Sequence, residues 1–321
     1  MDILSLNKYF GIIGIGIFIF ILSKTNLKEV YSTIKNLDYF LLTISFLLLL
    51  IVTLIISLRW RYIVNKTGIS LSIKDSIFIS FKSLFSEYSP GKTGYLLVTS
   101  VYLKNKTKED WGKIIFSTTF NKFMDVWITA IEALIGFIIL FWIFGIKSSV
   151  IIPIIVILAI IVLSFIFFIN YRLMKCALKL FFKLFIPKKY QENFENKFAS
   201  FYDNIHKINH KIILISLFYQ IITLIIAGLF FYFLGMAMGI HIPLYVAIIL
   251  EPIVAIASIL PISFSGLGTR EAGIAFLFSL INISLEYAII FSLITFLFRN
   301  LLILIGLMII PLEKYFEDDI S

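Results

Sequence analysis

The chain has 321 residues, of which 60% are hydrophobic and 15% are charged. A soluble domain is about 45–50% apolar and about 25% charged, so most of this chain is expected to lie in lipid. The net charge of +9 is too scattered for a nucleic-acid-binding protein, and the single cysteine, Cys176, excludes an intramolecular disulfide and a cysteine-based metal site. The composition predicts an all-α polytopic membrane protein, with one integral membrane domain over residues 1–321.

A helix that crosses a bilayer needs about 20 mostly apolar residues. About seven spans are predicted, in chain order Tyr9–Leu22, Phe40–Leu58, Ile114–Phe144, Val150–Ile169, Ile212–Met238, Leu244–Leu260 and Tyr287–Leu312. The first segment is short, but no small-residue cleavage pattern follows it. We therefore expect it to be retained as a helix and not removed as a signal peptide.

Two further segments, residues 77–103 and 264–282, are apolar but carry charges and glycine-containing breaks. Both are predicted to be re-entrant or broken helices, and the sequence leaves open whether they cross the membrane. Their turns are alike, since each combines glycines, a threonine and a basic residue: Ser89-Pro90-Gly91-Lys92-Thr93-Gly94 and Ser265-Gly266-Leu267-Gly268-Thr269-Arg270. This likeness suggests an internal pseudo-repeat, and the alternative is two unrelated turns.

Lysine and arginine are distributed unevenly between the two sides of this topology. With the N-terminus inside, the inner segments hold eighteen of them and the outer segments five, which predicts a cytoplasmic N-terminus. The loop of residues 172–211 carries nine and is patterned as two amphipathic helices, either lying on anionic lipid headgroups or packing on the bundle. No fourth ligand accompanies Asp203, His206 and His210, so no metal site is expected.

Charged residues inside bilayer segments cost about 2.5–3.5 kcal/mol each and therefore mark helix interfaces or substrate paths. On the Ile114–Phe144 helix, five polar residues share one face: Thr118, Lys122, Asp125, Thr129 and Glu132. Shorter polar faces are formed by Ser216, Gln220 and Thr223 and by Ser292, Thr295 and Arg299. We predict a polar path that includes Lys122, Asp125, Glu132, Glu251, Glu271 and Arg299. The alternative is a set of internal ion pairs, such as Lys122 with Asp125, that fix helix packing.

The two glycine turns offer a candidate site for a lipid phosphate. A helix that starts at such a turn directs unpaired N–H groups and the positive end of its dipole towards an anion, and paired broken helices mark binding sites in transporters. The predicted phosphate-binding residues are Gly91, Lys92, Gly94, Gly266, Gly268 and Arg270.

These residues carry a resemblance to a known family. Arg59-Trp60, the turn at residues 89–94, Asp125 and the run of residues 261–271 (PISFSGLGTRE) are similar to the flippase-like membrane proteins that resemble the transmembrane region of lysylphosphatidylglycerol synthase. The chain departs from the family pattern at Tyr95 and Val98, where the family favours an acidic residue and an arginine. It also has Asn121-Lys122 where the family favours Glu-Arg.

The resemblance implies lipid handling. Some members move an aminoacylated phospholipid across the bilayer, and archaeal relatives are linked to polyprenyl-phosphate sugars. Members that synthesise the lipid carry a further soluble domain, which we do not expect in this protein. The expected function is that of a lipid flippase or transporter in the plasma membrane, with a membrane lipid as substrate, a separate lipid-modifying or glycosyltransferase enzyme as partner, and no cofactor or catalytic residue.

Two alternatives stay open. One is a membrane-embedded enzyme or accessory of polyprenyl-phosphate glycosylation, although only Asp318-Asp319 resembles the carboxylate pair of metal-dependent sugar transferases. The other is a scaffold that anchors partners through its basic helices.

Overall fold

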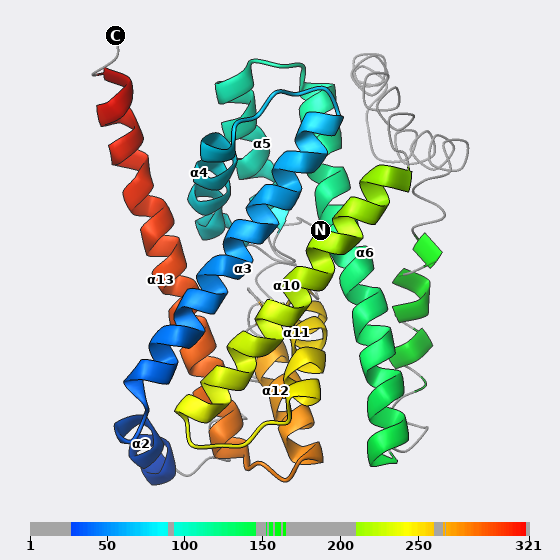
Figure 1. Ribbon diagram of the computed structural model, residues 1–321, viewed down its shortest axis with the longest axis vertical. Coiled ribbons are helices and arrows are strands. Elements are labelled where there is room, and N and C mark those ends of the chain that lie inside the picture. The colour runs from blue at the N-terminus through cyan, green and yellow to red at the C-terminus, as the bar shows by residue number, and fades with distance from the viewer. Residues whose placement is uncertain are drawn as a thin grey trace, which may run out of the picture. The chain divides into compact units, whose positions relative to one another are not determined.

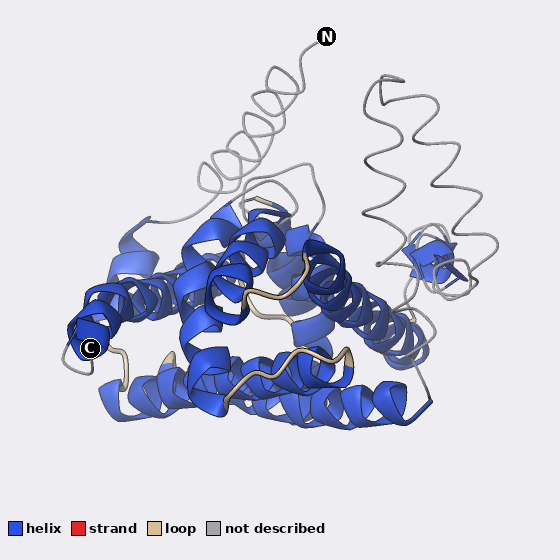
Figure 2. Cartoon of the chain, turned by 90° about the horizontal axis from the view of Figure 1, so that it is seen from above, coloured by secondary structure: helices blue, strands red, loops and turns tan. Residues whose placement is uncertain are grey.

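The computed structural model describes residues 27–88, 93–145, 210–259, 266 and 268–318, with short pieces between residues 152 and 164. Every element in these residues is helical (Figure 2), which confirms the predicted all-α class. The elements (Figure 1) are α2 (Leu27–Lys35), α3 (Tyr39–Lys66), α4 (Ile73–Ser83), the 3₁₀ helix η1 (Leu84–Tyr88), α5 (Thr93–Thr107), α6 (Trp111–Phe144), α10 (His210–Ala237), α11 (Leu244–Ile259), α12 (Thr269–Leu280) and α13 (Leu285–Asp318).

Four of the described helices are long and apolar enough to cross a membrane, namely α3, α6, α10 and α13. The fifth apolar helix, α11, has 16 residues and is shorter than a typical span. The predicted span Tyr9–Leu22 lies outside the described residues, and Val150–Ile169 is described only in pieces. A total of about seven spans therefore stays a prediction. Residues 172–209, including Asp203 and His206, also lie outside the described part.

Helix α3 continues beyond the boundary that hydropathy predicts. The apolar run ends at Leu58, where two arginines follow, yet the helix extends to Lys66. One face of its last two turns is buried, because Trp60, Ile63 and Val64 are at most 2% exposed. Arg61 remains in the helix because its Nε donates a hydrogen bond to the Leu71 carbonyl at 2.9 Å. An arginine whose donors are bonded within the protein does not need to end a membrane helix.

Separate helical elements lie on either side of both predicted breaks. In the first, α4 is followed by η1, which ends at Tyr88, and α5 starts at Thr93; residues 89–92 lie outside the described part. In the second, α11 ends at Ile259 and α12 begins at Thr269. The helices around the breaks have 11, 15 and 12 residues for α4, α5 and α12. At about 1.5 Å per residue, none of the three crosses a hydrocarbon core of about 30 Å by itself.

The chain divides into two compact units. The first unit contains residues 1–57, 77–98 and 221–321, and the second contains residues 58–76 and 99–220. Both broken segments thus contribute to the first unit. There, α12 packs against both α11 and α13, and α13 also contacts α2 and η1; the α11–α13 group is visible in Figure 1.

The first unit is held together by close helix packing around α13. Phe81 and Leu84 form a buried core with Leu302 and Ile303 of α13. Gly306 lies so close to α4 that an added Cβ would stand 2.1 Å from the Phe81 carbonyl oxygen. Only a residue without a side chain permits this approach.

The core of the second unit lies between α3, α6 and α10. It contains Ile63, Ile212 and four residues of α6 that recur every fourth position: Phe116, Phe120, Met124 and Ile128. Residues four apart lie on one face of a helix. α6 therefore carries this apolar face beside the polar face predicted from the sequence.

Candidate functional site

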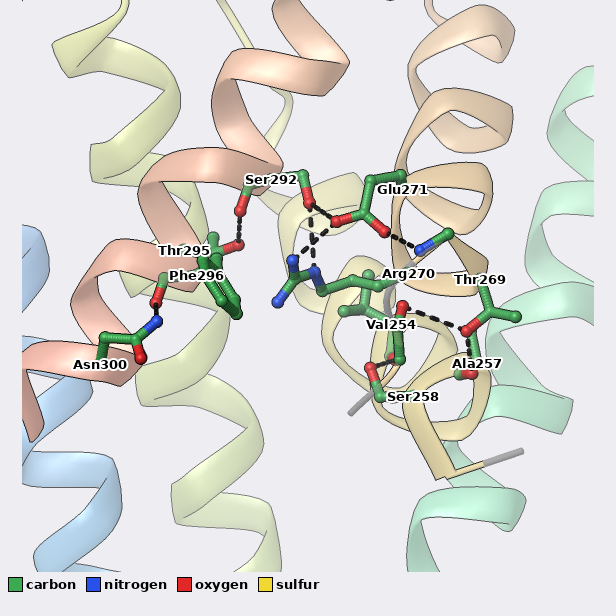
Figure 3. Close-up of polar contacts among 12 residues, drawn as sticks. Val254, Ala257, Ser258, Thr269, Arg270, Glu271, Ser292, Thr295, Phe296 and Asn300 are labelled. Carbon is green, nitrogen blue, oxygen red and sulfur yellow. Dashed lines mark hydrogen bonds and ion pairs between the residues drawn. The ribbon is translucent and has the colours of Figure 1, made fainter. Parts of the chain in front are cut away.

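In the first unit, the polar face of α13 is the place where both broken segments attach. Ser292, Thr295 and Arg299 are spaced three and four residues apart and therefore share one face. Ser292 bonds to α12 (Figure 3), and Arg299 pairs with Glu87 of η1. The two attachment points are seven residues apart, which is about 10.5 Å along the helix axis.

The attachment of α12 depends on a buried carboxylate. Glu271 is 2% exposed and accepts three hydrogen bonds of 2.6 Å each, from the Gly268 N–H, the Arg270 guanidinium and the Ser292 hydroxyl. The first bond caps the N-terminus of α12, since Gly268 is the N-cap residue and Glu271 stands at the third helical position. We call Gly268, Arg270, Glu271 and Ser292 the α12 cluster. Its charges cancel, because one arginine faces one glutamate.

Arg270 has three partners that hold its guanidinium in place. Its Nε donates to Ser292 Oγ at 3.1 Å, one terminal nitrogen contacts Glu271, and the guanidinium carbon lies 5.4 Å from the centre of the Phe296 ring. The side chain is 12% exposed. Figure 3 shows Arg270 between α12 and α13 with these contacts.

The turn before α12 is fixed to α11 by glycine geometry. Gly266 has a φ of +81°, and a Cβ added there would lie 2.8 Å from the Ser258 backbone. Gly268 also has a positive φ, of +87°. Thr269 Oγ1 donates to the Ala257 carbonyl at 2.7 Å. Gly266, Gly268 and Thr269 therefore permit the close approach of this turn to α11.

The attachment of η1 is an ion pair between Arg299 and Glu87, whose side chains are 33% and 13% exposed. These two residues stand 212 positions apart in the sequence. Their pairing fixes η1, within the first broken segment, to α13.

Glu251 is half-buried on α11, directly before Pro252. Pro252 lacks the N–H that would bond to the carbonyl one turn earlier.

In the second unit, five side chains from three helices form a continuous series of polar contacts, which we call the charged chain. Lys122 Nζ lies 3.2 Å from Asp125 Oδ2, and Asp125 Oδ1 lies 2.8 Å from the Arg59 guanidinium. Arg59 also donates to Gln220 Oε1, and Gln220 Nε2 donates to Glu132 Oε2 at 3.3 Å. From Lys122 to Glu132 the chain extends ten residues along α6, or about 15 Å.

Exposure differs along the charged chain. The Arg59 side chain is 1% exposed, whereas those of Lys122 and Asp125 are 22% and 26% exposed. The chain therefore has partly exposed residues on α6, which include Lys122 and Asp125, and a buried centre formed by Arg59. Arg59 belongs to α3, Asp125 to α6 and Gln220 to α10, so the centre joins three helices that are each long enough to span a bilayer.

The comparison with known families agrees with this architecture. The family described as the lysylphosphatidylglycerol synthase TM region matches residues 10–306. The chain belongs to this family. No curated protein and no solved structure matches the chain. Membership in this family of lipid-related membrane domains, together with the long apolar helices, identifies a multi-pass membrane protein.

The structure distributes the predicted residues of this family member between the two units. Of the predicted polar path, Lys122, Asp125 and Glu132 belong to the charged chain, and Lys122 does pair with Asp125, as the packing alternative supposes. Glu271 and Arg299 lie at the two attachment points on α13.

Of the predicted phosphate-binding residues, Arg270 and the Gly268 N–H contact the Glu271 carboxylate. Gly266 forms the turn before them, and Gly94 lies in the first turn of α5. Gly91 and Lys92 lie outside the described residues. Whether these residues bind a phosphate, and whether the polar path conducts a headgroup, stay predictions.

Sequence reasoning missed two important partners, Arg59 and Glu87. Arg59 counts among the inner basic residues that set orientation, yet it is almost fully buried and bonds to Asp125 and Gln220. A signal was present, because Arg59 directly follows an apolar span and is followed by Trp60 and further apolar residues. Glu87 is one of three charges in an ambiguous segment, and only the fold reveals that Arg299 is its partner.

Proposed function

We propose that this protein moves a phospholipid or a polyprenyl-phosphate-linked lipid across the plasma membrane, with its N-terminus on the cytoplasmic side. The observation that carries the proposal is the charged chain of the second unit. It places four ionisable side chains and one amide on α3, α6 and α10, which are apolar helices of spanning length. Membership in a lipid-related family of membrane domains supports it.

The physical argument concerns the headgroup. A charged group that crosses about 30 Å of hydrocarbon loses its water, and this loss is the main barrier to spontaneous lipid exchange between leaflets. Polar side chains along a helix interface replace part of that water while the acyl or prenyl tails stay in the bilayer. In this proposal, Lys122 and Asp125 meet the headgroup, because they are partly exposed residues of the charged chain.

The first unit supplies a second polar contact in this proposal. The lipid phosphate binds near Lys92 and Arg270, and Glu251, Glu271 and Arg299 line the path. Because the Glu271 carboxylate already accepts from Arg270 and from the Gly268 N–H, a phosphate at this position exchanges with a carboxylate. The displaced Glu271 carboxylate keeps its negative charge, so in this proposal it takes up a proton or pairs with a cation of the headgroup.

Reconstitution into liposomes tests the proposal. Vesicles that contain either a fluorescent phospholipid or a fluorescent polyprenyl phosphate are prepared with and without protein, and leaflet exchange is followed by quenching the outer leaflet. The expected result is faster exchange with protein for at least one lipid class. Asp125→Asn should reduce this exchange about tenfold or more, because it removes the anion between Arg59 and Lys122.

Asp75→Asn is the matched control, since Asp75 pairs with Lys106 at 3.3 Å near the surface of the same unit, with side chains 23% and 40% exposed. It makes the same chemical change outside the charged chain and should leave exchange unchanged. Exchange at the protein-free rate for both lipid classes would overturn the proposed function.

A further inference from the structure

The buried carboxylate of Glu271 depends on one cation among the described residues. The Arg270 guanidinium lies 2.6 Å from Glu271 Oε1, and the other two donors to this carboxylate, the Gly268 N–H and the Ser292 hydroxyl, are neutral (Figure 3). Glu271 is 2% exposed and Ser292 is 0% exposed, so water does not reach the carboxylate to replace a lost partner. A ligand that takes Arg270 therefore removes the charge that keeps Glu271 ionised.

The neighbouring helices offer no second cation beside Glu271 in the described residues. The helices that pack against α12 are α11 and α13. Their titratable side chains, over the described part of both helices, are Tyr245, Glu251, Glu286, Tyr287 and Arg299. Arg299 stands seven residues after Ser292, about 10.5 Å along the helix axis, and pairs with Glu87. The other groups of this set are carboxylates and tyrosines, which cannot neutralise a carboxylate.

The α12 cluster can also satisfy a neutral Glu271. Glu271 Oε2 accepts from the Gly268 N–H, and Oε1 lies 2.6 Å from Ser292 Oγ. A serine hydroxyl can either donate or accept. Ser292 Oγ now accepts from Arg270 Nε at 3.1 Å, and when Arg270 turns to another anion this acceptor becomes free for a proton on Glu271 Oε1. Both charge states of Glu271 therefore find hydrogen-bond partners in the same cluster.

We infer that a headgroup phosphate binds Arg270 together with one proton, which Glu271 takes up. The guanidinium exchanges the Glu271 carboxylate for the phosphate, and a proton from water adds to Glu271 Oε1 and bonds to Ser292 Oγ. The cluster is neutral before the exchange, with one arginine and one glutamate, and neutral after it, with one arginine, one phosphate charge and a carboxylic acid. The coupling applies to a headgroup that has no cation of its own.

A proton fits this position better than a metal ion. A hard metal cation takes about six oxygen ligands, whereas the described contacts of Glu271 include one further oxygen, Ser292 Oγ. A proton needs a single acceptor, and Ser292 supplies it. The inference rests on the proposed function, because the phosphate site at Arg270 belongs to that proposal, and it names the ion that binds with the lipid.

Titration calorimetry counts the protons directly. Short-chain phosphatidylglycerol is the probe, because it is a phosphodiester with no headgroup cation and its charge stays constant near neutral pH. Its binding to the full chain in detergent is measured in two buffers with different ionisation enthalpies, and the difference in heat gives the number of protons taken up. The expected result is about one proton for each bound lipid. Raising the pH opposes a binding step that takes up a proton, so the affinity should fall about tenfold for each pH unit.

Two glutamate variants assign the proton to Glu271. Glu271→Gln is neutral, keeps an acceptor for the Gly268 N–H and supplies an amide donor for Ser292. It should bind the lipid with no proton uptake and with an affinity that does not change with pH. Glu286→Gln is the matched control, because it makes the same chemical change in the first turn of α13, six residues before Ser292. It should take up about one proton, as the unmodified protein does.

Three outcomes overturn the inference: lipid binding by the unmodified protein without proton uptake, proton uptake that Glu271→Gln retains, or no binding of the lipid by the unmodified protein. The proton count of the unmodified protein requires no variant, so it stands even if Glu271→Gln fails to fold. Proton uptake on binding without leaflet exchange in liposomes would refute the proposed function and keep the proton coupling. Leaflet exchange without proton uptake on binding would refute the coupling alone.

Discussion

Ser292→Ala should be among the most destabilising small substitutions in the first unit. The hydroxyl is fully buried, donates to Glu271 Oε1 at 2.6 Å and accepts from Arg270 Nε at 3.1 Å. The substitution removes two hydrogen bonds to charged groups, each with a typical contribution of about 1.5–3 kcal/mol. Glu271 keeps its bonds to Gly268 and Arg270, so the lower end applies and the expected loss is about 3 kcal/mol.

Denaturant unfolding in detergent micelles measures this loss as a change in the free energy of unfolding. Ser279→Ala is the control, because Ser279 is exposed on α12 and its hydroxyl donates to the Phe276 carbonyl of the same helix. It should change stability by less than about 0.5 kcal/mol. A double-mutant cycle then identifies the partner. With Glu271→Gln already present, Ser292→Ala should cost clearly less than it does alone, because its charged acceptor is gone. Strict additivity of the two substitutions, or a loss below about 1 kcal/mol for Ser292→Ala alone, would refute the interpretation of the α12 cluster.

Two further predictions concern α13. Gly306→Ala should destabilise the protein by about 3 kcal/mol in the same unfolding assay, because its Cβ would stand 2.1 Å from the Phe81 carbonyl oxygen. Gly273→Ala is the control and should be neutral or stabilising, because the nearest atom to its Cβ would lie at 3.7 Å. Equal effects of the two substitutions would contradict the close packing of α13 on α4. Reversing the charge of Glu87 or of Arg299 alone should lower the free energy of unfolding by about 1–2 kcal/mol, and the double variant, Glu87→Arg with Arg299→Glu, should regain most of that stability. If the double variant is no more stable than the single variants, the ion pair does not hold η1 on α13.

Hydropathy predicts most of the described fold because bilayer thickness imposes a length on apolar helices. The segments Ile212–Met238 and Leu244–Leu260 match α10 and α11 within two residues at either end. The predicted C-terminal boundary of α3, at Leu58, is wrong by eight residues, because a hydropathy scale treats Arg59 as a residue that must be in contact with water. In the folded protein Arg59 bonds to side chains of two other helices, and a window along one helix contains no information about them.

The candidate site was predictable in its residues but not in its partners. Helical spacing places Lys122, Asp125 and Glu132 on one face, and the structure confirms that they share a connected set of contacts. Spacing also indicates that Arg270 and Glu271 stand at the start of a helix, but not that the carboxylate turns back to the Gly268 N–H. Several neighbouring residues can accept a hydrogen bond from the same donor, and the three-dimensional arrangement determines which of them forms it.

Pairing explains how a lipid-embedded chain can keep so many charges. Two unpaired charges in helices of this kind would cost about 5–7 kcal/mol on insertion scales, which is comparable with the entire stability of many proteins, about 5–15 kcal/mol. In the described residues each unit has an ion pair that joins segments far apart in sequence: Arg59 with Asp125, 66 positions away, and Glu87 with Arg299, 212 positions away. Each pair therefore also selects which helices pack together within its unit. In the proposed function, a headgroup that carries both a phosphate and a cation can bind both members of such a pair at once, so that neither member is left unpaired.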